Sequence, residues 1–130
     1  MDKIIIQHIT TDDPVMNAMI EAFIGLMHLR EADHVVWVGP QSDLVELTHI
    51  MWRRDMVLDC YGRPVTYRSL IKNLCEVLHI PCPKNPTAVL NNISNRKFST
   101  SSLYCRCAII MKADGSRNPL ERFVMRREEG

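Results

Sequence analysis

Apolar residues recur at three- and four-residue steps in several separate stretches, and this spacing constrains the fold more than any other feature of the chain. The stretches 15–27, 44–52 and 70–78 each carry it. Such spacing places the apolar side chains on one face of an α-helix, where they can be buried together. Proline and glycine separate the stretches, so the sequence predicts several short helices rather than one long helix.

Capping residues place the first three helices. Asp12 or Asp13 before Pro14 predicts a helix start, because a carboxylate accepts first-turn amides and proline loses no needed donor. This helix is expected to run from Pro14 to about residue 29. A second is expected over 42 to about 57, with acidic residues early and arginines late, the order that the helix dipole favours. A third follows Thr66 and covers about 67–80.

The second half of the chain predicts two further helices. Prolines at positions 81, 83 and 86 prevent the third helix from continuing, since each lacks the amide that a helix interior needs. Pro86, after Asn85, opens a fourth helix that turns Val89, Leu90 and Ile93 inward. A fifth begins at Ser99 or Thr100 and closes at Gly115, where glycine adopts the required backbone conformation.

The remaining segments complete a single domain, residues 1–130. Residues 2–9 predict an extended arm or short strand, and the β-branched segment 34–40 predicts another short strand. Residues 14–115 form the expected helical core, and the tail 116–130 is expected to dock loosely or fray. The predicted fold is therefore mainly α: a compact bundle of about five helices, with one or two short strands near the N-terminus.

Composition excludes several classes of protein. No apolar run approaches the roughly 18 residues of a membrane span, and the acidic start lacks the pattern of a secretory signal. Five cysteines at irregular spacing fit reduced thiols better than a disulfide framework. We therefore expect a cytoplasmic protein with no membrane partner.

Motifs for catalysis and metal binding are missing from the sequence. There is no glycine-rich phosphate loop, no HExxH and no G-x-S-x-G. Cys105 and Cys107, joined by Cys82 or His79, invite a zinc interpretation, but structural zinc sites use different spacing. The alternative is that Cys107 is a small apolar core residue and Cys105 is half exposed. We expect no enzyme, metal or cofactor.

Charge is strongly segregated along the chain. Residues 1–62 carry a net charge of −6 and residues 63–130 a net charge of +7, although the total is only +1. Such asymmetry is typical of a basic half that meets an anionic partner. The alternative is that the two halves attract each other, within the fold or across a dimer.

The segment from Thr66 to Lys97 combines two predicted helices with a basic, amide-rich end. In a helix-turn-helix reader the first helix braces the second, which offers amides to base edges and cations to phosphates. The candidate phosphate contacts are Arg68, Lys84, Arg96 and Lys97, and the candidate base contacts are Asn91, Asn92 and Asn95. The alternative is a frayed helix end in an ordinary bundle, since the connection HIPCPKNP is longer than the usual turn.

About half of the sequence resembles the C-terminal region of the RteC family, regulators associated with excision of conjugative transposons. The first motif is W-x-G-x-x-S-x-L-x-E-L, at Trp37, Gly39, Ser42, Leu44, Glu46 and Leu47. The similarity continues through Leu70, Leu74, Leu78 and Ile80, and then through Leu90, Ile93, Arg96, Lys97, Thr100 and Leu103. The resemblance implies a helix-turn-helix or winged-helix-like domain that binds DNA upstream of genes it activates, with contacts from Arg96, Lys97 and neighbouring asparagines.

The sequence thus predicts a non-enzymatic regulatory or accessory protein, linked to a mobile element, that binds duplex DNA. The alternative is a protein-interaction module or homodimeric structural protein that does not bind DNA.

Overall fold

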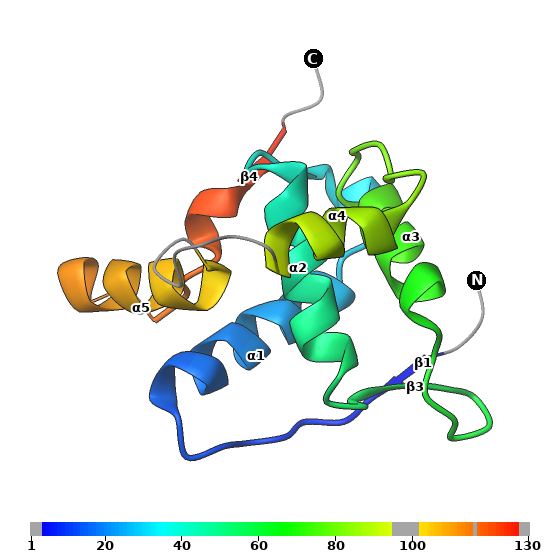
Figure 1. The fold of residues 1–130 in the computed structure, drawn as a ribbon, viewed down its shortest axis with the longest axis horizontal. Helices are drawn as coiled ribbons and strands as arrows, with labels where there is room; N and C mark the ends of the chain where they lie inside the picture. Colours follow the sequence, from blue (N-terminus) through cyan, green and yellow to red (C-terminus); the bar gives the residue numbers. More distant parts are fainter. Residues whose placement is uncertain (1–3, 95–101, 116, 128–130) are drawn as a thin grey trace.

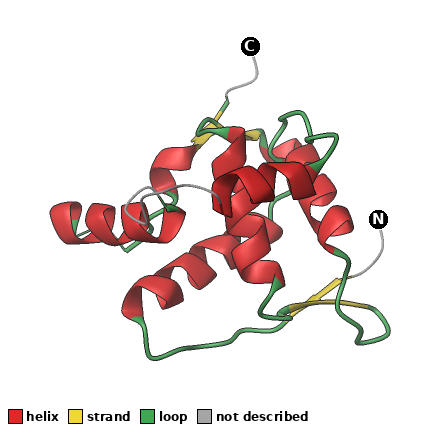
Figure 2. Ribbon diagram, in the orientation of Figure 1, coloured by secondary structure: helices red, strands yellow, loops and turns green. Residues whose placement is uncertain are grey.

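The structure is a computed structural model that describes residues 4–94, 102–115 and 117–127, with only the backbone of residues 92–94. Five α-helices and four three-residue strands lie in these residues (Figures 1 and 2). The helices are α1 (Pro14–Met27), α2 (Gln41–Trp52), α3 (Tyr67–Val77), α4 (Pro86–Ser94) and α5 (Leu103–Asp114). The strands are β1 (Ile4–Ile6), β2 (Val35–Trp37), β3 (Val57–Asp59) and β4 (Val124–Arg126), and short 3₁₀ turns lie at Glu31–Asp33 and Glu121–Phe123. The prediction of a mainly α fold is confirmed.

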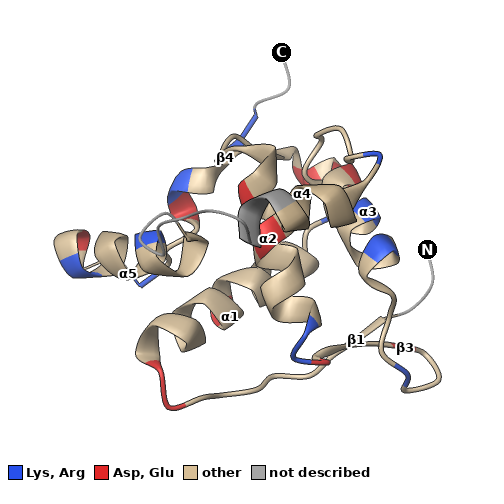
Figure 3. Cartoon of the chain, viewed as in Figure 1, with Lys and Arg blue, Asp and Glu red and all other residues tan. Residues whose placement is uncertain are grey.

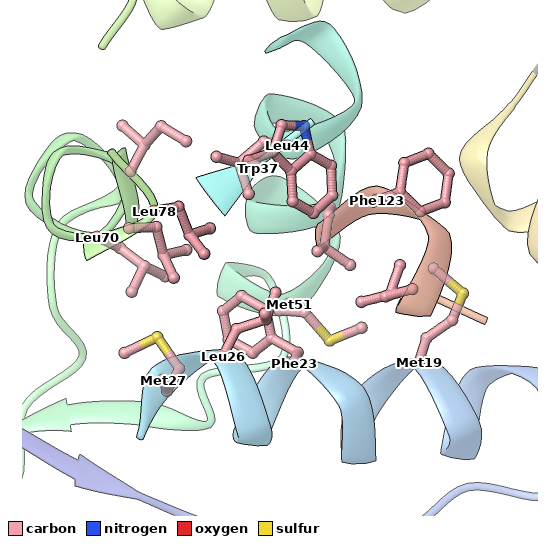
Figure 4. Close-up of a cluster of buried hydrophobic side chains, with 14 of the residues drawn as sticks. Met19, Phe23, Leu26, Met27, Trp37, Leu44, Met51, Leu70, Leu78 and Phe123 are labelled. Carbon is pink, nitrogen blue, oxygen red and sulfur yellow. The ribbon is translucent and has the colours of Figure 1, made fainter. Parts of the chain in front are cut away.

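Helix α2 forms the centre of the molecule. It packs against α3, α4 and α5, and α1 packs against α5. Leu44, Leu47 and Met51 of α2 have no exposed surface, because neighbours cover the helix on more than one side. Figure 4 shows Phe23 of α1 beside Met51 and Met19 of α1 pointing toward the side of Phe123, while Leu70 and Leu78 approach from the side of α3. The result is one hydrophobic core shared by all the helices.

The strands pair segments that lie far apart in the sequence. β1 pairs with β3 in antiparallel register, Ile4 opposite Asp59, and β2 pairs with β4, Val35 opposite Arg126. Each described sheet has two strands, and neither is a hairpin of consecutive strands. Each sheet therefore joins two segments that are separated in the sequence by at least one helix.

Four helix boundaries follow the predicted capping chemistry. Asp13 Oδ1 accepts a hydrogen bond from the Val15 amide at 2.9 Å, and Thr66 Oγ1 accepts one from Ser69 at 3.1 Å. α4 begins at Pro86, and Gly115 ends α5 with a φ of 62°. α5 begins at Leu103 after Ser102, and the expected start at residues 99–100 lies outside the described residues.

The predicted C-terminal end of the second helix was wrong. α2 ends at Trp52 rather than near residue 57, and Asp55 adopts a φ of 53°, which an α-helix does not contain. The chain then enters β3, which hydrogen-bonds to β1. A partner about 50 residues away in the sequence thus replaces the last helical turn that local patterning favours.

The tail was expected to dock loosely, which was wrong for Leu120 and Phe123. Leu120 is 1% exposed and Phe123 is 9% exposed. The Phe123 ring stacks on Trp37 with a centroid distance of 5.3 Å, and its carbonyl accepts a hydrogen bond from Val38 at 2.7 Å. The segment therefore contributes to the core, and β4 continues it as a strand.

Candidate functional site

The predicted DNA-contact residues fall into two groups. Arg68 lies on α3, Lys84 lies in the connection before α4, and Asn91 lies on α4; all three are exposed. Asn92 belongs to α4, but its side chain is not described. The remaining predicted contacts, Asn95, Arg96 and Lys97, lie outside the described residues. The structure therefore locates the first group and leaves the second as predictions.

The connection between α3 and α4, residues 78–85, is held at both ends. His79 adopts a φ of 56°, and the Ile80 amide donates back to the Cys75 carbonyl at 3.1 Å, which together form a Schellman cap. The Gln41 side chain donates to the Pro81 carbonyl at 2.5 Å. Asn85 Oδ1 accepts from the Ala88 amide at 3.1 Å and so caps α4. The connection is longer than a helix-turn-helix turn, yet its backbone has defined partners.

Helix α4 packs mainly on α2, and the two helices border an open hollow with both polar and apolar lining residues. The hollow measures about 400 Å³ and is lined by Glu46, His49, Ile50, Arg53, Thr87, Leu90 and Asn91. Asn91 therefore lies at the edge of this hollow as well as on the surface. In a helix-turn-helix unit the second helix is braced by the first, whereas here α2 is the principal support of α4.

Two carboxylates of α2 hold the beginning of α5. Asp43, which is 1% exposed, accepts two hydrogen bonds from the Arg106 guanidinium, at 2.7 and 2.5 Å. This interaction raises the pKa of Arg106. Glu46 accepts a hydrogen bond from the Leu103 amide at 2.8 Å and so satisfies a first-turn donor of α5. One attraction between the acidic and basic halves thus lies inside the fold.

Sequence patterning missed this role of α2. Asp43 and Glu46 stand three residues apart and so share one side of the helix, which is a visible signal. Their early position in α2 suggested the helix dipole as their reason. Their burial depends on α5, which comes about 60 residues later, and helical periodicity does not reveal that contact.

Basic residues are spread over several elements (Figure 3). Several arginines are paired with carboxylates: Arg30 with Asp33, Arg63 with Asp59, Arg106 with Asp43 and Arg122 with Asp114. Eight exposed cations have no carboxylate partner among the described residues: Arg53, Arg68, Lys72, Lys84, Lys112, Arg117, Arg126 and Arg127. Of these, Arg68, Lys72 and Lys84 lie on α3 and on the connection that leads into α4.

The described residues show no arrangement suited to a metal ion. No group of three His, Cys, Asp or Glu side chains in residues 4–94, 102–115 and 117–127 is placed to hold one. Cys107 is fully buried in the core and Cys105 is half-buried, as the apolar alternative predicted. Among the described helices, none is long and apolar enough to cross a membrane.

Comparisons with known proteins give no family for the chain. No family model matches it, and neither the curated proteins nor the solved structures contain a significant match. The resemblance to RteC regulators therefore stays a prediction from the residues quoted above.

Proposed function

We propose that the protein binds duplex DNA through α3, the connection 78–85 and α4, as a non-enzymatic regulatory or accessory protein. The observation that carries the proposal is the set of three exposed cations, Arg68, Lys72 and Lys84, without carboxylate partners among the described residues. Cations of this kind neutralise phosphates and release condensed counterions, which supplies affinity for DNA of any sequence.

The composition of the surrounding segment supports the same surface. Between Cys60 and Ala113 the chain has eight Lys and Arg but a single acidic residue, Glu76. The acidic α2 turns Asp43 and Glu46 inward, so these charges do not oppose an approaching polyanion at the surface. The basic segment therefore presents its excess charge outward on α3 and the connection.

Helix α4 is the element that we propose to read bases. Thr87, Ala88 and Asn91 are exposed on it, and an asparagine amide can pair with adenine in the major groove. Helix-turn-helix character is part of this proposal, with α3 and α4 as its two helices and with α2, the principal support of α4, as the bracing element. The resemblance to RteC regulators supports a role at a mobile element and adds Arg96 and Lys97 as phosphate contacts.

The test is fluorescence anisotropy of a labelled random-sequence duplex, titrated with the protein at several salt concentrations. We expect micromolar binding with a steep negative salt dependence. Arg68→Ala with Lys84→Ala should weaken binding and lower the slope by roughly two units, because each lost phosphate contact removes about 0.9. Arg96→Ala with Lys97→Ala should have the same effect.

A charge-matched control separates this surface from net charge. Arg30→Ala with Lys112→Ala removes two positive charges from outside α3, the connection and α4, and should leave the slope nearly unchanged. Equal losses in the control and in the Arg68 and Lys84 variant would reject the surface. No binding at low salt would reject DNA as the partner, and salt-sensitive self-association would then favour the protein-interaction alternative.

A further inference from the structure

Two cysteines meet at the end of α3. Cys75 lies on the inner face of the helix and is 1% exposed, while Cys82 is exposed in the connection. The Schellman cap turns the chain back on the helix through the bond from the Ile80 amide to the Cys75 carbonyl. The side chains of Cys75 and Cys82 are therefore close enough to interact.

The connection restricts how far Cys82 can move. Pro81 and Pro83 flank it, and proline fixes its own φ and limits the residue before it. The Pro81 carbonyl is also held by Gln41. Little chain entropy therefore remains to be lost when a covalent bond forms between the two sulfurs.

We propose that Cys82 and Cys75 are a reversible dithiol, which a hydroperoxide converts to an intramolecular disulfide. Access selects Cys82 as the first sulfur to react, because it is exposed and Cys75 is covered. Burial, together with the neighbouring Cys82, raises the pKa of Cys75 to about 12, so Cys75 remains a thiol at neutral pH and reacts second.

The chemistry balances in two steps. The Cys82 thiolate attacks the peroxide, an S–O bond forms as the O–O bond breaks, and the departing oxygen takes a proton to leave as water or an alcohol. Cys75 then attacks the sulfenic sulfur of Cys82, an S–S bond forms as the S–O bond breaks, and hydroxide leaves with the Cys75 proton as water. Proximity compensates for the weak acidity of Cys75 in the second step. A small dithiol reductant reverses the reaction by exchange.

The sequence makes the product simple to detect. Trypsin cleaves after Lys72 and Lys84, so both cysteines lie in one peptide, residues 73–84. The disulfide makes this peptide lighter by two hydrogen atoms and protects it from alkylation. Cys60, which is exposed in the turn after β3, provides a matched control because it is as accessible to peroxide as Cys82 but lies outside peptide 73–84.

The experiment treats the reduced full chain with one equivalent of hydrogen peroxide, followed by alkylation and peptide mass analysis. We expect the oxidised 73–84 peptide in the wild type and in Cys60→Ser, and its loss after reduction. Cys82→Ser should give none of it. In Cys75→Ala, Cys82 should instead take up oxygen and react with a sulfenic-acid probe.

The proposal would be contradicted if peroxide oxidised Cys60, or joined two molecules by a disulfide, while peptide 73–84 remained fully alkylated. Cys82 is exposed, so Cys82→Ser should keep the far-ultraviolet circular dichroism of the wild type, and its result does not depend on refolding a core variant. The measurement contains no DNA, so its outcome is independent of the proposed function.

Discussion

Gly39 lies where an aromatic ring leaves no space for a side chain. A Cβ atom at this position would be 2.5 Å from Cδ1 of Phe123, the ring that stacks on Trp37. We expect Gly39→Ala to lower the free energy of unfolding by about 1–3 kcal/mol, the usual cost of adding atoms to a packed core. Denaturant unfolding followed by tryptophan fluorescence measures this change.

Gly25 provides the matched control for that substitution. It lies inside α1, and a Cβ atom there would meet nothing within 4 Å. Gly25→Ala should raise stability by about 0.5–1 kcal/mol, because alanine has the higher helix propensity. If both variants changed stability in the same direction, the close approach of Phe123 would not be the cause.

His49 gives the protein a sensitivity to moderate acid. Burial, and secondarily the positive charge of Arg53, lower the pKa of His49 in the folded state. The unfolded chain therefore takes up the proton at higher pH than the folded chain does, near the ordinary value of about 6.5. Stability is fully present above that value and is lost as the pH falls from there through the lowered pKa.

The variant His49→Gln tests this dependence. It should flatten the decrease in stability between about pH 7 and pH 5, because the titrating group has been removed. His28→Gln, which changes an exposed histidine, serves as the control, and an equal flattening in both variants would show that the effect is not specific to His49. An unaltered profile in His49→Gln would show that the acid sensitivity comes from another group.

At the scale of elements, α2 and α5 are joined by the pair of Asp43 and Arg106. Arg106→Ala leaves the buried Asp43 carboxylate without its guanidinium partner, which typically costs about 3–5 kcal/mol. We expect about 3 kcal/mol, since the Arg106 side chain is 34% exposed and water can enter the space it leaves. Urea unfolding of the single variants and of the double variant with Asp43→Ala measures the coupling.

The exposed pair of Arg122 and Asp114 is the comparison for this effect. Arg122→Ala should cost no more than about 1 kcal/mol, because water screens charges at the surface. An Arg106→Ala variant that lost no more stability than Arg122→Ala would contradict the structural role assigned to the buried pair.

The elements also show where sequence reasoning succeeds. Asp13, Thr66, Pro86 and Gly115 mark helix boundaries that the structure confirms, because capping chemistry acts over only a few residues. β3 was missed, since the Val57–Asp59 segment becomes a strand only by pairing with β1. The predicted end of α2 failed for the same reason.

At the scale of the whole molecule, the candidate site could be predicted only in part. Arg68 and Lys84 are exposed, as a phosphate-contacting role requires, and their charge and position are properties of the sequence itself. The hollow between α2 and α4 was not predicted, because it brings His49 and Arg53 beside Asn91 from helices that are far apart in the sequence. Periodicity identifies the face of one helix but does not select its neighbour.

The pairing of β2 with β4 determines how late in synthesis the fold can be completed. Its register joins Val35 to Arg126, so β2 is made 91 residues before the last strand residue that pairs with it. On a ribosome, α1, α2 and α3 emerge while Trp37 still lacks the ring of Phe123. A nascent chain that pauses after α5 therefore exposes an unpaired strand edge and an uncovered indole, the features that chaperones and proteases recognise.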